Sequence, residues 1–432
     1  MDRLIETLYS AYRKSYHVTT DSRQITPGCI FFAFKGETFD GNAFAPKALE
    51  QGAAYCVLSD PQYRVDDRCL VVDDVLLVLQ QLARRHRAEL QIPFVGITGT
   101  NGKTTTKELV SAVLSKRYRT HATQGNHNNH LGVPLTLLEI GPDVQVAVVE
   151  MGANHPGEIE FLCTISDPDC GLITNCGKAH LEGFGSFDGV VATKTELYRH
   201  IAHKGGLLFV NADSDLLVRE SEKLGSVALK TYGQAEGTMC RGSYVGSDPY
   251  MRFYFEVGDN VYTVQTRLLG GYNFDNAMAA VCVGLHFGVD PFDIKEAIEA
   301  YEPTNKRSQY RKSDRNALIL DCYNANPSSM KVAVENFAAL KADRKVVMLG
   351  GMKELGADSV LEHRRVVDMV EASGFDSIVL VGAEFEGMSP SALWFADSDQ
   401  ARAYFESHPL SGATILLKGS NGSRMWLIEQ AL

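Results

Sequence analysis

The sequence lacks a long hydrophobic run and lacks an excess of positive charge. No apolar stretch approaches the ~18 residues of a membrane-spanning helix. Lys and Arg number 42 against 53 Asp and Glu, which gives a formal net charge of -11. These features argue against membrane and nucleic-acid partners. A local cationic cleft for an anionic small molecule stays possible, because net charge does not describe how charges are distributed.

The nine cysteines include no C-x-x-C pair. Their odd number, and their position mostly inside apolar runs, predict buried thiols in a reducing compartment, by default the cytoplasm. Residues 1–15 mix apolar and charged positions, which predicts a short amphipathic helix rather than a signal peptide. The cysteines are Cys29, Cys56, Cys69, Cys163, Cys170, Cys176, Cys240, Cys282 and Cys322.

Short apolar runs alternate with helical patterns along the 432 residues, which predicts an α/β fold of two to four domains. We expect three segments, 1–90, 91–303 and 304–432. Predicted strands are Cys29–Phe34, Ala54–Leu58, Leu70–Val72, Phe94–Thr98, Val146–Val149, Gly171–Thr174, Leu207–Val210, Ala317–Asp321, Lys345–Leu349, Ser377–Val381 and Thr414–Leu417. A hairpin is predicted over Met251–Val257 and Val261–Leu268, and helices over Val75–Leu90, Phe274–Phe287 and Asp293–Tyr301.

A glycine-rich loop is the strongest local signal. Gly96–Thr105 follows an apolar strand and opens a helix, which is the context of a phosphate-binding loop. Lys103 can reach the β- and γ-phosphates of a nucleotide, and the Thr104 hydroxyl can bind Mg²⁺. The general pattern has glycine where Ile97 stands. The alternative is a turn without a ligand; otherwise the loop predicts ATP or GTP, but it does not name the reaction.

Three further residues carry weaker signals. Glu150 ends a buried strand, where a carboxylate can bind Mg²⁺ or cap the helix that starts near Pro156. By residue type alone, His180 is a solvated loop histidine and Lys194 a surface lysine of a helix.

Taken together, these residues resemble the Mur ligase family along the whole chain. Thr98–Thr104 resembles its T-G-T-N-G-K-T loop, and Glu150 matches its Mg²⁺-bridging glutamate. His180 matches its histidine for a second Mg²⁺. Lys194 matches its lysine that CO₂ carbamylates, which makes an anionic ligand for a hard cation. The resemblance therefore implies ATP, two Mg²⁺ sites and a carbamate on Lys194, with Lys103, Glu150, His180 and Lys194 as the catalytic set.

The resemblance also implies the architecture. Residues 1–90 are a smaller α/β domain that binds a UDP-sugar substrate. Residues 91–303 are the P-loop domain with a mostly parallel sheet flanked by helices. Residues 304–432 are a Rossmann-like α/β domain that closes on ATP about a hinge near residues 302–305 and binds an incoming dipeptide. We expect a monomer.

Three motifs resemble one branch of the family. They are Gly125–Asn129 (G-N-H-N-N), Tyr323–Pro327 (Y-N-A-N-P) and Leu349–Gly356 (L-G-G-M-K-E-L-G). That branch joins D-alanyl-D-alanine to UDP-N-acetylmuramoyl-tripeptide through an acyl phosphate during peptidoglycan synthesis. The alternatives are another ligase of the family, or a P-loop ATPase module without ligase activity. The sequence leaves open whether the third peptide residue is diaminopimelate or lysine.

The resemblance assigns the remaining site residues. For ATP they are Gly99, Thr100, Asn101, Gly102, Lys103, Thr104, Thr105, Asn273, Asn276, Arg307 with its neighbour Lys306, and Asp321. For the UDP-sugar they are Ser22, Arg23, Lys35, Gly36, Asp40, Gly41, Asn42, Asn126, Asn128 and Asn129. For the dipeptide they are Tyr323, Asn324, Asn326, Lys418, Ser420 and Arg424. Asn273 can alternatively cap a helix, and residues 40–42 can form a plain turn.

Four positions depart from the family pattern. Tyr272 stands for histidine, Gly351 for aspartate, Asn421 for arginine, and Cys322 for serine or threonine. None belongs to the loop or to the catalytic set.

Overall fold

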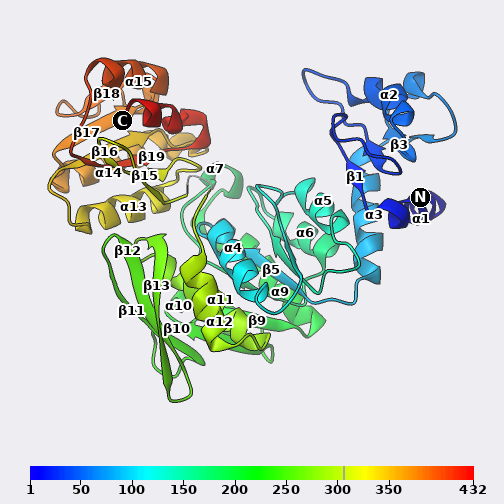
Figure 1. The fold of residues 1–432 in the computed structure, drawn as a ribbon, viewed down its shortest axis with the longest axis horizontal. Coiled ribbons are helices and arrows are strands. Elements are labelled where there is room, and N and C mark those ends of the chain that lie inside the picture. Colours follow the sequence, from blue (N-terminus) through cyan, green and yellow to red (C-terminus); the bar gives the residue numbers. More distant parts are fainter. Residues whose placement is uncertain (305–306) are drawn as a thin grey trace.

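The computed structural model describes residues 1–304 and 307–432 and contains three separate sheets, each with its own helices (Figure 1). The predicted α/β class is confirmed. Each sheet lies within one of the segments 1–90, 91–303 and 304–432, and we keep those boundaries as a proposal. Among the helices of the described ranges, none combines the length and apolarity needed to cross a bilayer.

The N-terminal sheet is fully parallel, with its strands in sequence order. The first helix packs because Leu8 and Tyr12 fall on one face and are fully buried. The strands are β1 Val18–Thr19, β2 Ile30–Phe32, β3 Tyr55–Leu58 and β4 Cys69–Val71. The helices are α1 Asp2–Ser15, η1 Gly41–Phe44, α2 Ala45–Glu50, η2 Pro61–Tyr63 and α3 Val75–Glu89.

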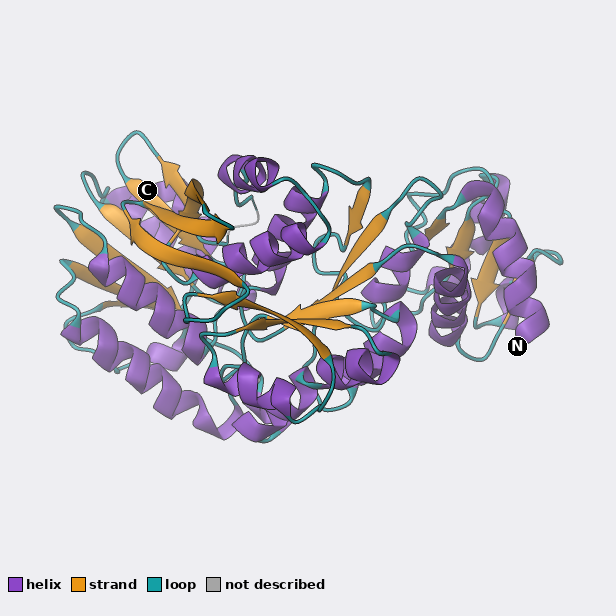
Figure 2. Ribbon diagram, turned by 90° about the horizontal axis from the view of Figure 1, so that it is seen from below, coloured by secondary structure: helices purple, strands orange, loops and turns teal. Residues whose placement is uncertain are grey.

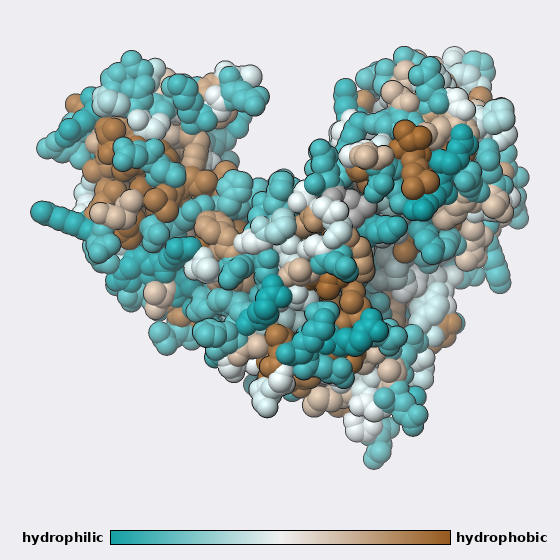
Figure 3. Space-filling model, turned by 180° about the vertical axis from the view of Figure 1, so that it is seen from behind, coloured by the Kyte–Doolittle hydropathy of each residue, from teal (hydrophilic) through white to brown (hydrophobic). Residues whose placement is uncertain are grey.

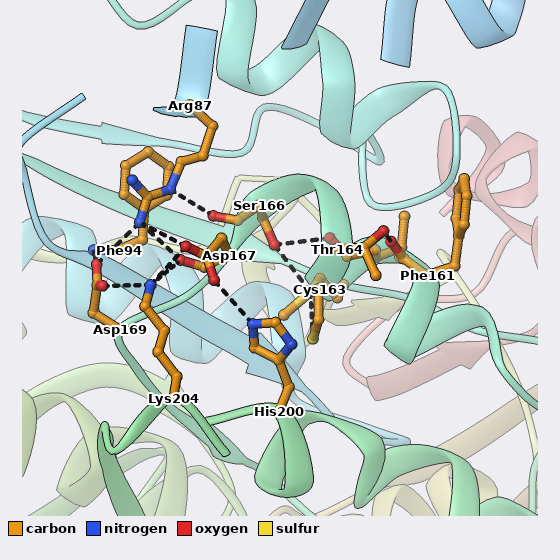
Figure 4. A network of polar contacts seen from close by, with 12 residues as sticks. Arg87, Phe94, Phe161, Cys163, Thr164, Ser166, Asp167, Asp169, His200 and Lys204 are labelled. Atoms are coloured by element: carbon orange, nitrogen blue, oxygen red, sulfur yellow. Dashed lines mark hydrogen bonds and ion pairs between the residues drawn. The ribbon is translucent and has the colours of Figure 1, made fainter. Parts of the chain in front are cut away.

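Helix α3 ties the N-terminal unit to the central one through Arg87 (Figure 4). The Arg87 guanidinium donates to the carbonyls of Ser166 and Asp167, both at 2.8 Å, and pairs with the Asp169 carboxylate at 3.3 Å. It also lies 3.9 Å from the centre of the Phe94 ring. A buried cation satisfied on every side holds this joint in one geometry.

The central sheet has nine strands in the order β13-β12-β11-β10-β9-β8-β5-β7-β6. Pairing is parallel from β6 to β11 and antiparallel from β11 to β13. The predicted hairpin is confirmed, with Val257 opposite Asn260. The strands are β5 Phe94–Thr98, β6 Thr120–Ala122, β7 Val146–Glu150, β8 Cys170–Ile173, β9 Leu207–Asn211, β10 Ala228–Gly233, β11 Cys240–Ser247, β12 Tyr250–Val257 and β13 Asn260–Leu269.

Helices cover both faces of this sheet (Figure 2). Along β5, Phe94 packs in the core that reaches α1 and α3, whereas Val95 and Ile97 pack in the core under α4 and α11. The helices are α4 Lys103–Leu114, α5 Gly132–Leu138, α6 Glu158–Ser166, α7 Leu181–Phe184, α8 Phe187–Lys194, α9 Glu196–Lys204, α10 Asp215–Glu222, α11 Asn273–His286 and α12 Pro291–Ala300.

The C-terminal sheet runs in the order β14-β15-β19-β16-β17-β18 and is parallel except for β14. Its strands are β14 Gln309–Lys312, β15 Ala317–Asp321, β16 Lys345–Gly350, β17 Ser377–Val381, β18 Leu393–Phe395 and β19 Thr414–Lys418. Its helices are α13 Pro327–Ala339, η3 Gly356–Asp358, α14 Ser359–Ala372, η4 Ala383–Phe385, α15 Ser398–Ser407, η5 Asn421–Ser423 and η6 Met425–Ala431.

The N-terminal and C-terminal units stand on opposite sides of the central one (Figure 1). The space-filling view is hollowed between these two lobes (Figure 3). Loops of the C-terminal unit contact the loops that follow β5 and β8, as the Asn326 amide does when it donates to the Asn101 side chain at 2.9 Å. The carboxyl ends of the central strands, where α/β proteins bind ligands, therefore face the C-terminal unit.

Candidate active site

A cleft of about 1190 Å³ lies where the central and C-terminal units meet. It gathers residues that are distant in sequence. The predicted residues that line it are Thr100, Asn101, Gly102, Lys103, Thr104, Thr105, Asn126, Asn128, Asn129, Glu150, His180, Asn273, Asn276, Arg307, Asp321, Tyr323, Asn324 and Lys418. The other predicted residues of the described ranges, including Gly99, Lys194, Asn326, Ser420 and Arg424, do not line it.

Two glycines of the phosphate loop are required by its shape. Gly102 has φ 79°, and a Cβ there would lie 2.5 Å from Oδ1 of Asn276 on α11. Gly99 has φ 145°, and a Cβ there would lie 2.0 Å from Oγ1 of Thr174. Both conformations favour glycine, and neither site has space for a side chain. The loop therefore packs against α11 and against the end of β8.

Asn175 fixes the backbone of the phosphate loop by a hydrogen bond, and the sequence analysis did not select this residue. Its Oδ1 accepts from the Asn101 backbone N–H at 3.0 Å, and the Thr174 hydroxyl donates to the Asn101 carbonyl at 2.6 Å. Asn175 closely follows strand β8, which neighbours β5. An amide at the end of a strand beside a phosphate loop is the signal that could have identified it.

Lys103 begins helix α4 and folds back over its own loop. Its ammonium donates to the carbonyls of Gly99 at 2.8 Å and Thr100 at 3.0 Å. Burial lowers the pKa of Lys103 to about 8; Glu150 opposes the shift and Arg307 adds to it. A phosphate would supply a negative charge to pair with this half-buried lysine.

Glu150 ends β7 and is 1% exposed. Its Oε1 accepts from the Asn128 amide at 2.8 Å, whereas its buried Oε2 has no hydrogen bond among the described residues. The capping role is wrong, because Glu196 accepts from the Gly157 and Glu160 N–H groups that open α6, both at 2.9 Å. A buried carboxylate oxygen without a donor fits a cation ligand.

The described residues contain no cluster of three or more His, Cys, Asp or Glu side chains that could hold a metal ion alone. This does not argue against Mg²⁺, which is usually bound by one or two carboxylates together with substrate phosphates. Glu150 and the Thr104 hydroxyl, which is buried in the same cleft, fit that donor set.

Lys194 is the last residue of α8 and is 2% exposed, so the surface role is wrong. Its amine donates to the Ala153 carbonyl at 3.4 Å and lies 5.3 Å from the centre of the Phe184 ring. Burial, and after it the nearby Lys103 charge, lower the pKa of Lys194 to about 7. A large share of this side chain is therefore an uncharged, nucleophilic amine at neutral pH.

His180 lies in the wall of the cleft rather than in open solvent. Its backbone has φ 50°, and its Nδ1 contacts the Glu354 carboxylate of the C-terminal unit. Burial lowers the pKa of His180, Glu354 opposes the shift, and Lys103 and Lys194 add to it. Those electrostatic effects place His180, Lys103 and Lys194 in one neighbourhood.

The asparagines of α11 satisfy each other inside the fold. The Asn276 amide donates to Oδ1 of Asn273 at 2.9 Å, and the Asn273 amide donates to the Leu269 carbonyl at 2.8 Å. Thr106 of α4 donates its hydroxyl to Oδ1 of Asn276 at 3.0 Å. Asn273 makes no side-chain cap of α11. Both residues line the cleft, and their contact with adenine stays a prediction.

Two charged residues enter the cleft from the C-terminal unit. Arg307 lies with its guanidinium 3.6 Å from the centre of the Tyr323 ring, a cation–π contact. Asp321 accepts from Lys418, which is 1% exposed, at 2.7 Å. Both contacts stay inside the C-terminal unit and stiffen the wall that faces the phosphate loop. Lys306, predicted beside Arg307, lies outside the described residues.

The remaining predicted dipeptide residues have structural contacts. Ser420 donates to the Gly351 carbonyl at 2.7 Å, and Arg424 is an exposed residue that pairs with Asp399 at 3.6 Å. A Cβ on Gly351 would lie 2.6 Å from Oε2 of Glu384. The departure from aspartate at this position is therefore matched by Glu384, whose carboxylate occupies that space.

The residues of the N-terminal unit that were predicted to bind the UDP-sugar do not line the cleft, and several of them pair with one another. Arg23 is 88% exposed and binds the Asp21 carboxylate at 2.7 Å, and Lys35 lies 3.7 Å from Asp40. Asn42 is fully buried, and its Oδ1 accepts from the Ser59 N–H at 2.9 Å. Residues 40–42 therefore form a turn that fixes the fold, and their contact with a nucleotide-sugar stays a prediction.

Comparison with known families gives consistent matches along the chain. Residues 97–284 match the Mur ligase middle domain, and residues 306–421 match the Mur ligase glutamate ligase domain. Residues 14–87 match the catalytic domain of the Mur ligase family.

Individual relatives cover nearly the full length. The UDP-N-acetylmuramoyl-tripeptide--D-alanyl-D-alanine ligase of Bacillus subtilis is 34% identical and covers 94% of this chain and 91% of its own. The Escherichia coli ligase of that name is also 34% identical, over 96% of this chain and 93% of its own. A crystal structure of MurF from Acinetobacter baumannii superposes with a TM-score of 0.85 at 32% identity, over 96% of this chain and 92% of that one. The MurF ligase of Thermotoga maritima in complex with ADP superposes with a TM-score of 0.84 at 27% identity, over 96% of each chain.

Proposed function

The chain belongs to the Mur ligase family, and we propose that it joins D-alanyl-D-alanine to UDP-N-acetylmuramoyl-tripeptide with ATP in peptidoglycan precursor synthesis. The observation that carries the proposal is the convergence of Lys103, Glu150 and His180 on one cleft with the buried amine of Lys194 beside it. An ATPase that releases phosphate to water does not need His180 and a buried lysine amine beside its phosphate loop.

The first step transfers the γ-phosphate. The terminal carboxylate of the tripeptide attacks the γ-phosphorus of ATP, which forms an acyl phosphate and breaks the bond to ADP. Nucleophile and phosphate are both anionic, and Lys103 supplies positive charge where they meet. The loop N–H groups at the start of α4 add the positive end of the helix dipole.

The second step forms the amide. The uncharged amine of D-alanyl-D-alanine attacks the acyl carbon, and the tetrahedral intermediate collapses with release of inorganic phosphate and a proton. The acyl phosphate reacts readily with water, so the site must exclude solvent between the steps. In the cleft, Arg307 and Tyr323 of the C-terminal unit provide a wall opposite the phosphate loop.

Glu150, the Thr104 hydroxyl and His180 are the residues that would hold Mg²⁺ here, together with the nucleotide phosphates. When bound, Mg²⁺ neutralises phosphate charge and orients the γ-phosphoryl group. Asn128 donates to Oε1 of Glu150, whereas the buried Oε2 has no hydrogen-bond donor among the described residues and so could accept a cation.

We place a carbamate on Lys194. The uncharged amine adds to CO₂ and loses one proton, which converts a buried neutral group into a carboxylate-like anion. The low pKa of Lys194, caused first by burial, favours the reactive amine. The negative carbamate would attract the neighbouring Lys103 ammonium, whereas an ammonium on Lys194 would repel it.

The two substrates would reach the cleft from its two ends. The exposed guanidinium of Arg23 and the exposed ammonium of Lys35 suit the diphosphate of the UDP-sugar. The dipeptide would enter by the C-terminal unit, near Tyr323 and Asn324.

Product formation tests this function. The protein is incubated with ATP and Mg²⁺, with each substrate alone and with both, and phosphate release and product mass are measured. We expect release only with both substrates, and a product heavier by the dipeptide less one water. Release that ignores both substrates would leave a P-loop ATPase. Ligation of another amino acid in place of the dipeptide would assign the chain to a different reaction of its family.

A further inference from the structure

Glu354 of the C-terminal unit reaches into the central unit and contacts His180. It follows β16 in the segment before η3, whereas His180 precedes α7, so the contact spans the interface between the two units. The Glu354 carboxylate oxygen Oε2 accepts from Nδ1 of the His180 ring. Both backbones adopt the left-handed conformation, with φ 50° at His180 and 62° at Glu354. Two non-glycine residues in this conformation meet at one contact.

The contact determines which ring nitrogen of His180 is free. A carboxylate can only accept a hydrogen bond, so the proton of the neutral ring lies on Nδ1. The other nitrogen, Nε2, then carries the lone pair. It makes no hydrogen bond within residues 1–304 and 307–432, and His180 lines the cleft. Histidines that bind metals commonly donate their second ring nitrogen to a carboxylate, which fixes tautomer and ring orientation.

Neighbouring contacts show that this geometry depends on the C-terminal unit lying against the central one. The Lys178 N–H donates to the Ser328 hydroxyl at 3.0 Å, and the Lys178 ammonium lies 3.8 Å from the Glu362 carboxylate. Asn326 donates to Asn101 of the phosphate loop at 2.9 Å. Glu354 therefore reaches His180 in the same arrangement that covers the phosphate loop.

We infer that Glu354 is a positioning residue that orients His180 for metal binding only when the C-terminal unit is closed. The inference rests on the proposed function, because that function gives His180 its metal. It couples domain closure to the completion of the phosphoryl-transfer site: with the units apart, the His180 ring loses the partner that fixes it. Binding of the last substrate would thus assemble the metal site as it excludes water.

The chain offers variants that separate positioning from simple closure. Glu354→Ala removes the acceptor, whereas Glu354→Gln keeps an oxygen that can accept from Nδ1. Lys178→Met removes a different ion pair across the same interface and leaves His180 untouched. The Glu354 side chain is 54% exposed, so these variants are expected to fold. Thermal unfolding of each protein checks this directly.

The measurement uses Mn²⁺ in place of Mg²⁺, with β,γ-methylene-ATP and UDP-N-acetylmuramoyl-tripeptide bound. Pulsed electron paramagnetic resonance detects a nitrogen nucleus bonded to Mn²⁺, and ¹⁵N-histidine labelling assigns it to imidazole. His180→Ala supplies the spectrum without this coupling. Small-angle scattering of the same samples reports closure.

We expect imidazole coupling in the parent protein, its loss in Glu354→Ala, its recovery in Glu354→Gln, and no change in Lys178→Met. Turnover with Mg²⁺ should fall about 10- to 100-fold in Glu354→Ala with its main effect on kcat, as for other residues behind a metal ligand. Imidazole coupling retained in Glu354→Ala would overturn the inference, because His180 would then bind the metal without Glu354. Absence of coupling in a parent protein that ligates normally would overturn it too. A parent protein that does not ligate at all would instead overturn the proposed function.

Discussion

The charged residues in and beside the cleft and the N-terminal residues Arg23 and Lys35 were all predicted from the family pattern, yet they differ in burial. Lys194, Glu150 and Lys418 are each no more than 2% exposed. Arg23 is 88% exposed, and Lys35 is 69% exposed. In the first region the protein holds charges out of water before any ligand binds, whereas in the second the charges pair locally in solvent.

This difference predicts different consequences for the two regions. Buried charges interact strongly and shift each other's pKa, so removing one should affect the chemical step. Exposed charges are screened, so removing one should affect encounter and binding. Four variants test this comparison.

Lys103→Ala should cause the largest loss. In the proposed mechanism the ammonium supplies positive charge at the transferred phosphate, so kcat should fall by about 10²- to 10⁴-fold. Steady-state turnover with all substrates saturating measures this. Near-normal turnover would show that Lys103 is not part of the mechanism. It would also contradict the expectation that charges in the cleft affect the chemical step more than exposed charges do.

Lys194→Met should also abolish most turnover, and the parent protein should depend on CO₂ and pH. Only the uncharged amine adds to CO₂, and its fraction rises as pH passes through the pKa of about 7. At limiting CO₂, turnover should therefore increase from about pH 6 to about pH 8, either side of that pKa, and added bicarbonate should restore activity most strongly at the acidic end. Turnover indifferent to CO₂ removal would contradict the carbamate.

The lowered pKa of Lys194 should also make the stability of the protein depend on pH. In the folded chain the pKa of Lys194 is lowered to about 7 from its ordinary value of 10.5, so between these two values the unfolded chain binds more protons. Stability of the ligand-free protein should therefore rise with pH across this window, and Lys194→Met should weaken the rise. Denaturant unfolding at several pH values measures it.

Arg23→Ala should change binding and leave the chemical step intact. Loss of one exposed guanidinium should raise the KM for the UDP-sugar substrate by about 10-fold, with kcat unchanged, because the charge-assisted contact is made equally before and during reaction. Arg64→Ala is the matched control, because Arg64 is another exposed arginine of the N-terminal unit and pairs with Asp67 at 2.8 Å. A fall in kcat as large as that of Lys103→Ala would contradict the comparison.

Asp21→Asn should have the smallest effect and the opposite sign. Asp21 binds the Arg23 guanidinium at 2.7 Å, and its pKa is lowered to about 2 by that hydrogen bond. Without this competitor, Arg23 is free for the diphosphate, so the Kd for the UDP-sugar substrate should fall by about 2-fold, the scale of an exposed ion pair. Isothermal titration with the UDP-sugar substrate measures the change. Weaker binding would indicate that Asp21 orients Arg23 rather than competes for it.

Much of the fold could be predicted because buried parallel strands have a strong sequence signal. Phe94–Thr98 is a continuous apolar run, and the hairpin at residues 258–259 has alternating strands beside a Gly-Asp turn. Strand β11 was missed because Gly242 and Gly246 interrupt it and its exposed positions show no clean alternation. Its place beside β10 and β12 depends on pairing with distant residues, which local patterns do not carry.

The candidate site could be predicted only where a residue belongs to a recognisable motif. Lys103, Glu150 and Lys194 were predicted; the first two line one cleft, and Lys194 is buried close enough to Lys103 to feel its charge. Asn175 and the contact of Glu354 with His180 were not, because each joins segments that meet only in the folded chain. The same applies to Glu196, which accepts from the backbone N–H groups at the start of α6 in the role considered for Glu150.

Transfer of ¹⁸O from the tripeptide carboxylate to inorganic phosphate is the most direct test of the acyl-phosphate mechanism. The tripeptide substrate is prepared with ¹⁸O in its terminal carboxylate and turned over with ATP and D-alanyl-D-alanine. If that carboxylate attacks the γ-phosphorus and the amine then attacks the acyl carbon, each inorganic phosphate released carries one ¹⁸O from the carboxylate. Phosphate released without the label, alongside formation of the amide, would contradict the acyl phosphate and the roles assigned to the cleft.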